Sequence, residues 1–115
     1  MRISNRQKFI KLCEKYNLQY TSKEDRPELD LYTTQPYVGE RCWLMAYKSE
    51  INRILVAKYA YYGFDGGNKI GYYSTNKYKS PKQIEQLIKE YNEALLQCKE
   101  YELNKRIEAA NADFG

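Results

Sequence analysis

The sequence predicts an α+β domain built from a helix, a three-stranded antiparallel β-meander and a long C-terminal helix. Two observations mark the helices: a Ser-x-x-Gln capping-box pattern begins at Ser4 and again at Ser80, and each is followed by apolar residues at helical spacing. A third marks the sheet, because runs rich in aromatic and aliphatic residues alternate with turn residues between the two helices. With 115 residues the chain has the size of one domain, so residues 1–115 are expected to fold as a single unit.

The first helix is predicted over residues 5–16, with Asn17 as its C-terminal stop. Its core-facing residues recur at helical spacing: Phe9, Leu12 or Cys13, and Tyr16. The following residues, 19–40, are rich in loop-forming residues. Only residues 29–32 alternate in polarity, which is compatible with a short edge strand or with an extended arm.

Three strands are predicted over residues 41–48, 53–62 and 69–76. A turn at 49–52 separates the first two, and a loop at 63–68 rich in Gly and Asn separates the last two. Short connections of this kind make sequence neighbours into neighbours in the sheet, which predicts an antiparallel meander.

The last helix begins at Pro81, because proline at the first helical position loses no hydrogen bond, and is expected to reach about residue 109. A helix of that length is about 43 Å long, so it must overhang a compact core, bend or end early, and residues 99–115 are expected to be an overhanging helix or a tail. One stripe is predicted to pack on the sheet: Ile84, Leu87, Ile88, Tyr91, Leu95 and Cys98. A second, rotated stripe is predicted either to bind a protein partner or a second copy, or to fold back onto the core: Leu96, Leu103, Ile107 and Phe114.

The composition argues against a catalytic or metal-binding role. The chain contains no histidine, which removes the commonest general base and transition-metal ligand. Its cysteines, Cys13, Cys42 and Cys98, are far apart and are expected to be buried free thiols. The alternative, a catalytic thiol, lacks the histidine that usually serves as its base. No phosphate-binding loop or nucleophile motif occurs. We therefore expect a non-enzymatic protein without metal or cofactor. The absence of a signal sequence and of a long apolar run predicts a soluble, cytoplasmic chain that does not contact a membrane.

Charge is segregated along the chain although the net charge is only +4. Residues 41–82 carry eight basic and two acidic residues, whereas residues 83–115 carry four basic and seven acidic ones. The basic block also contains seven of the 13 tyrosines. Basic side chains neutralise phosphates and exposed rings stack on unpaired bases, while three lysines at a helix N-terminus add to a site that already favours anions. The predicted DNA- or RNA-binding residues are Lys58, Tyr59, Tyr61, Lys69, Tyr73, Lys77, Tyr78, Lys79 and Lys82.

The same residues have a purely structural interpretation, because lysines beside strands prevent edge-to-edge aggregation and tyrosines are ordinary sheet residues. Two competing functions also remain. One is a protein-interaction module, such as an inhibitor or adaptor of the kind that phages and mobile elements encode, which would dock through its charge-segregated surfaces and its last helix. The other is an enzyme that uses carboxylate or lysine chemistry in a pocket.

Two families resemble the chain at the level of fold. The order of elements resembles double-stranded RNA-binding domains, in which lysines also stand at the start of the last helix, here Lys77, Lys79 and Lys82. The loop at 63–68 and the insertion at 17–40 depart from that family. The sheet and residues 90–94 are also similar to AP2-type domains, which read DNA with a three-stranded sheet, although the spacing to the helix cap is about one helical turn longer here. Both are resemblances at the level of fold, and a shared fold does not by itself assign a function.

Overall fold

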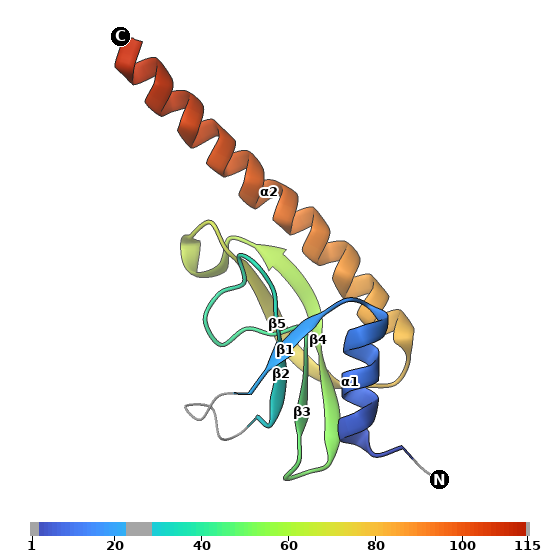
Figure 1. The fold of residues 1–115 in the computed structure, drawn as a ribbon. Helices are drawn as coiled ribbons and strands as arrows, with labels where there is room; N and C mark the ends of the chain where they lie inside the picture. The colour runs from blue at the N-terminus through green and yellow to red at the C-terminus, as the bar shows by residue number, and fades with distance from the viewer. Residues whose placement is uncertain (1–2, 23–28, 115) are drawn as a thin grey trace.

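The computed structural model describes residues 3–22 and 29–114, and the side chains up to residue 112. In chain order the elements are α1 (Asn5–Lys15), β1 (Gln19–Thr21), β2 (Leu31–Thr34), β3 (Met45–Lys48), β4 (Arg53–Tyr62), a 3₁₀ turn (Phe64–Gly66), β5 (Ile70–Lys77) and α2 (Pro81–Phe114). The strands form one antiparallel sheet in the order β1-β2-β3-β4-β5, and both helices pack on it (Figure 1). The α+β class is therefore confirmed.

The sheet has five strands, so the prediction of three was too low. Of the segment left open at residues 29–32, only Leu31 and Tyr32 belong to a strand, β2, which lies between β1 and β3 and is therefore not an edge strand. Thr33 of β2 is buried, and its Oγ1 accepts hydrogen bonds from the backbone N–H groups of Leu44 and Met45, at 2.9 and 3.1 Å. β1 has only three residues, too few for a periodic pattern, and is held in place by pairing with β2. The strand predicted over 41–48 begins only at Met45, and Arg41 has a left-handed φ of 63°.

The first helix was predicted correctly to within one residue. Ser4 Oγ accepts from the N–H of Gln7, whose side chain accepts from the N–H of Ser4, and this completes the capping box. Asn17, with a φ of 55°, takes the left-handed conformation that ends many helices. At the start of α2, Gln83 Oε1 accepts from the N–H groups of Lys79 and Ser80, which is the Gln half of the second predicted capping box.

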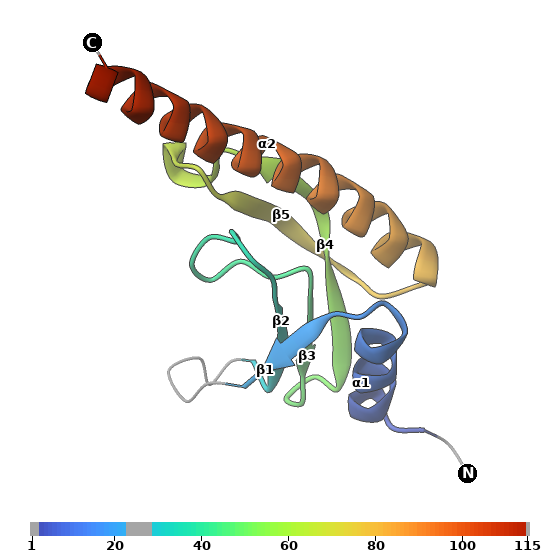
Figure 2. The ribbon, with the colours of Figure 1, turned by 45° about the horizontal axis from the view of Figure 1, so that its top comes forward.

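Both helices cover the same side of the sheet (Figure 2). At one end, α1 and the start of α2 share a core with β3 and β4, in which Phe9, Met45, Val56 and Ile84 are fully buried. At the other end, β4 and β5 continue beyond β3 as a two-stranded ribbon that packs against α2. Residues of the ribbon and of α2 form a second core there, which includes Ala60, Tyr62, Ile70, Tyr72, Tyr91, Ala94 and Cys98. Alternation along the strands turns the other residues of the ribbon to the opposite side, which we call the open face.

The second helix is one continuous element that extends past the sheet (Figure 1). The predicted core stripe is confirmed: Ile84, Leu87, Tyr91 and Cys98 are buried, and Ile88 and Leu95 are half-buried. Among the described residues, two hydrogen bonds nearest the C-terminal end of α2 hold this helix to other elements. Asn68 Nδ2 donates to Cys98 O at 3.2 Å, and Tyr37 Oη donates to Glu102 at 2.6 Å. Residues 103–112 are all exposed, and the molecule is accordingly elongated, measuring 67 × 30 × 22 Å. Within the described residues, no helix is both long and apolar enough to cross a membrane.

Candidate nucleic-acid interface

Three tyrosine rings lie together on the open face. The rings of Tyr59 and Tyr73 are stacked, with centroids 5.1 Å apart and an interplanar angle of 23°. The ring of Tyr61 lies 6.2 Å from that of Tyr59 and is tilted to it by 58°. The exposed fraction is 44% for Tyr59, 56% for Tyr73 and 36% for Tyr61. These large rings therefore remain accessible although each touches another ring. The result is a continuous aromatic surface of three side chains from two strands.

Register explains why these rings meet. Tyr59 and Tyr73 are directly opposite each other in the β4–β5 ladder, and cross-strand neighbours have Cβ atoms about 5 Å apart. Tyr61 faces Gly71, and its ring lies across that glycine: a Cβ on Gly71 would come within 2.5 Å of the Tyr61 Cζ. Gly71 therefore makes room for the Tyr61 ring on the sheet surface.

The hydroxyl groups separate these three tyrosines from most of the others. Six tyrosines use their hydroxyl as a hydrogen-bond donor to another residue: Tyr16, Tyr37, Tyr47, Tyr62, Tyr72 and Tyr91. Within the described part of the chain, the hydroxyls of Tyr59, Tyr61 and Tyr73 make no such bond. Their polar ends therefore remain free for water or a ligand, and the fold does not use them as anchors.

Three basic side chains lie farther along the sheet, one on each of β3, β4 and β5. Lys48 and Arg53 are directly opposite each other in the β3–β4 ladder, and Lys77 is paired with Leu55 in the next ladder. Like charges in directly opposed positions destabilise a sheet, and among the described residues none of these three cations forms an ion pair with a carboxylate. The sheet thus holds three positive charges that its own side chains do not neutralise.

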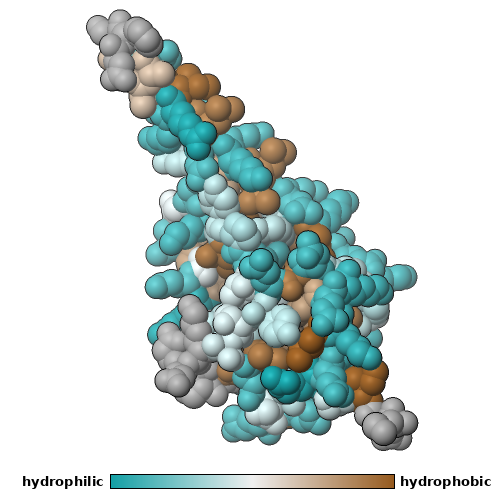
Figure 3. Space-filling model, in the orientation of Figure 1, coloured by the Kyte–Doolittle hydropathy of each residue, from teal (hydrophilic) through white to brown (hydrophobic). Residues whose placement is uncertain are grey.

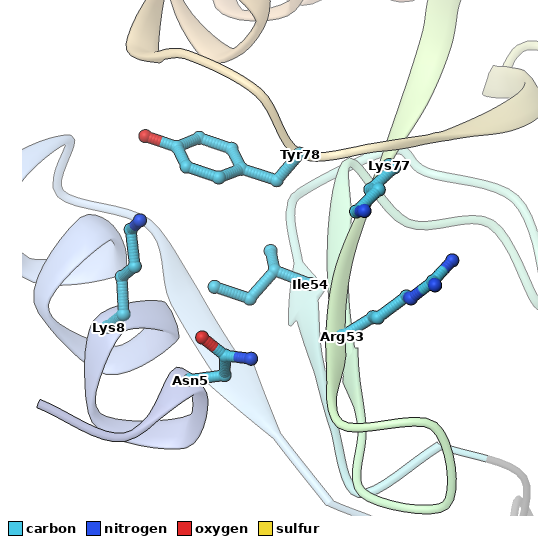
Figure 4. Close-up of a pocket in the computed structure, with 6 residues that line it drawn as sticks. All are labelled: Asn5, Lys8, Arg53, Ile54, Lys77 and Tyr78. Carbon is cyan, nitrogen blue, oxygen red and sulfur yellow. The ribbon is translucent and has the colours of Figure 1, made fainter.

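Figure 4 shows how two of these cations, Arg53 and Lys77, lie relative to α1. Arg53 and Lys77 are on one side of β4, whereas Lys8 and Tyr78 are on the α1 side, where Lys8 Nζ lies 5.1 Å from the centre of the Tyr78 ring. Together with Asn5 and Ile54 they line a pocket of about 120 Å³. Ligand pockets for small molecules usually have about 300 to 1,000 Å³, so this one fits a phosphate-sized group better than a whole metabolite.

The structure divides the predicted binding residues between several places. Tyr59, Tyr61, Tyr73 and Lys77 share the open face, and Lys69 is exposed just before β5. Alternation places Lys58 on the helix side with Val56 and Ala60, opposite Ser74, which has a φ of 58° where the ladder is interrupted. The ring of Tyr78 packs against the core.

The lysine-rich start of α2 offers less to an anion than the sequence indicated. Lys79 and Lys82 are exposed in the connector and in the first turn of the helix. However, the N–H groups of Lys79 and Ser80 donate to Gln83, so two of the backbone donors near this helix end are already used. The open face is therefore the better-defined candidate site.

Sequence reasoning missed Lys48 and Arg53 as candidate site residues. The signal was available, because Arg53 has the same parity as Tyr59 and Tyr61 within a strand whose limits were predicted correctly. The same parity rule would have separated Lys58 from the three rings.

The second predicted stripe is exposed on α2. Leu96, Leu103 and Ile107 have exposed fractions of 58%, 55% and 49%, and Figure 3 shows apolar patches recurring along the projecting part of this helix. Tyr101, which the sequence reading omitted, is also 45% exposed and lies under Lys105 Nζ, which is 5.6 Å from the ring centre. The side chain of Phe114 lies outside the described residues.

The described side chains form no cluster suited to a metal ion. Cys13 and Cys98 are buried free thiols, and burial raises the pKa of Cys13 to about 12 and raises the pKa of Cys98. Cys42 is free and half-buried. Glu90 Oε1 accepts from the N–H of Ala60 at 2.8 Å and so holds the ribbon to α2.

Comparisons with protein-family models, curated proteins and solved structures found no significant match to this chain.

Proposed function

We propose that this protein binds nucleic acid through the open face of its sheet and acts without catalysis. The observation that carries the proposal is the group of three accessible tyrosine rings, Tyr59, Tyr61 and Tyr73, which touch one another on the side of the sheet that neither helix covers. Aromatic rings on a sheet surface offer flat faces to bases, and this stacking tolerates any base because every base has a π-face.

The cations on the same face support the same function. Lys48, Arg53 and Lys77 carry positive charges for which the described residues supply no carboxylate partner, and phosphates are natural partners of such groups. A competing explanation is that stacked cross-strand rings merely stabilise the ribbon and that the cations merely protect it from aggregation. Binding measurements separate the two explanations, because only the first requires affinity for nucleic acid.

The variant Arg53→Gln/Lys77→Gln is expected to weaken binding and to make it less dependent on salt. Each phosphate contact that is lost removes about 0.7 to 0.9 from the slope of log affinity against log salt, so the slope should fall by up to about 1.8. Fluorescence anisotropy with a labelled oligonucleotide over a range of salt concentrations measures this slope. Lys89→Gln/Lys99→Gln removes the same charge from exposed positions on α2 and should leave the slope close to that of the wild type. Equal slopes for the two variants, or no binding by the wild type at low salt, would refute the proposal.

A second candidate function, self-association through α2, has its own supporting observation. Leu96, Leu103 and Ile107 are separated by seven and four residues, so they lie along one side of the helix at the spacing of a helix–helix seam. Residues 99–112 contain three basic and three acidic residues, so two copies of this segment would meet without net repulsion. In an antiparallel pair, Leu103 of one copy can pack against Ile107 of the other, which gives a two-fold symmetric contact.

The variant Leu103→Asp/Ile107→Asp is expected to abolish such a dimer while the domain stays folded, because both side chains are exposed. Sedimentation equilibrium at several protein concentrations measures the association, and circular dichroism checks the fold. Ala109→Asp/Ala112→Asp adds the same charge on another side of the helix and should leave the dimer in place. A wild-type protein that is monomeric at the highest accessible concentration would contradict this second function.

A further inference from the structure

We infer that the ligand of the open face is a single strand, whose unpaired bases lie on the rings of Tyr59, Tyr61 and Tyr73 and whose phosphates follow the sheet toward Lys77 and Arg53. This inference rests on the proposed function and names the class of nucleic acid that it takes. Three observations carry it: the stacked rings in the middle of the open face, the position of the cations beside them, and the ring hydroxyl groups that no described residue holds.

The middle of the open face is built for ring stacking. A sheet that reads a duplex in the major groove needs long hydrogen-bonding side chains that reach the edges of paired bases. The centre of this ribbon instead carries Tyr59 and Tyr73, stacked on each other, with Tyr61 beside them. The stack covers one face of each of these two rings, so a base would contact an outer ring face. In a duplex the faces of the bases are themselves covered by neighbouring base pairs. Only unpaired bases can use this surface.

The positive charges lie at one side of the rings and not among them. Lys77 is four residues from Tyr73 along β5, which corresponds to about 13 Å of strand. Arg53 and Lys77 both line the pocket of about 120 Å³ that is also lined by Lys8. A strand whose bases rest on the rings would therefore place a following stretch of its backbone over these cations. Duplex binding through the backbone alone would leave the rings without a contact.

The three ring hydroxyls favour loose sequence preference. None is held by another described residue, so each can rotate to donate to or accept from whatever base edge is near. A site that fixed one base would need donors and acceptors locked in place by neighbours. We therefore expect the site to accept single-stranded DNA or RNA of mixed sequence.

The test compares one labelled mixed-sequence oligonucleotide, as DNA and as RNA, alone and annealed to its complement, at low salt. Wild-type protein should bind at least one of the single strands at least tenfold more tightly than the corresponding duplex. Tyr59→Leu/Tyr73→Leu removes the rings and keeps apolar bulk, so it should reduce single-strand affinity to the duplex level. Tyr59→Phe/Tyr73→Phe keeps the rings and should retain at least half of the single-strand affinity.

The outcomes separate this inference from the function on which it depends. Equal affinity for single strand and duplex, unchanged by the leucine substitutions and reduced by Arg53→Gln/Lys77→Gln, would overturn the single-strand inference and leave nucleic-acid binding standing. No binding of any of the four oligonucleotides would overturn both. Thermal unfolding of each variant shows that the loss of binding is not a loss of fold, and the phenylalanine variant provides a second reading at the same positions.

Discussion

Replacing both Tyr59 and Tyr73 with alanine is expected to weaken single-strand binding at least about tenfold. Stacking of a base on an aromatic side chain contributes about 1 to 3 kcal/mol, and 1.4 kcal/mol corresponds to a factor of ten in affinity. The two rings are stacked on each other at 5.1 Å, so the double substitution removes the centre of the aromatic surface and leaves Tyr61 alone. Anisotropy titrations at constant salt measure the change.

The same substitution should cost the fold little. With exposed fractions of 44% and 56%, the two rings contribute much less to the core than a buried ring does. Cross-strand pairs contribute about 0.2 to 1 kcal/mol, so a small decrease in the free energy of unfolding is expected. A variant that melts far below the wild type, or one that binds as tightly as the wild type, would show that these rings serve the sheet and not a ligand.

The second large effect is a loss of the folded state as the pH rises from about 9 toward 12. Burial is the main cause, and the charge of Glu14 a smaller one, that raises the pKa of Cys13 from 9.0 to about 12. Burial also raises the pKa of Tyr91 from 10.0 to about 12. Burial also raises the pKa of Tyr72. Because the folded values lie above the unfolded ones, the unfolded chain releases these protons first. Their contribution to stability is therefore complete below pH 9 and is lost as the pH approaches 12.

Urea unfolding at a series of pH values measures this decline. Tyr91→Phe is the informative variant, because Tyr91 Oη donates to Pro36 O at 2.9 Å and links α2 to the β2–β3 connection. At neutral pH the variant should lose about 0.5 to 1.5 kcal/mol, the usual net contribution of such a bond. Its stability should then fall less steeply between pH 10 and pH 12 than that of the wild type. Parallel curves would mean that Tyr91 does not lose its proton on unfolding.

The elements that could be predicted are those whose signal lies in their own residues. Both limits of β4 and the start of α2 were predicted correctly, because β4 lies between turn residues and α2 begins with a proline that directly follows a serine. β1 was missed because it is defined by its pairing with β2 and not by a pattern of its own. The polar residue Thr33 gave no sign of burial, since its reason for being buried lies in backbone N–H groups 11 and 12 residues away.

The candidate site shows the same division. The tyrosine-rich basic block pointed to the right strands, but composition cannot say on which side of a strand a residue lies. Lys58 is next to Tyr59 in the sequence and lies on the other side of the sheet, whereas Lys48 is far from Tyr73 in the sequence and shares its face. Which hydroxyls are already bonded, and which remain free, depends on tertiary neighbours such as Glu102 and Gln35.

The most direct test of the account is to map the binding surface by NMR while a single-stranded oligonucleotide is added to the full chain. We expect signals from both parts of the open face to shift together with one affinity: the ring signals of Tyr59, Tyr61 and Tyr73 and the backbone signals of Lys77 and Arg53. The signals of residues 103–112 should not shift. Shifts confined to the projecting part of α2, with the three ring signals unmoved, would contradict it.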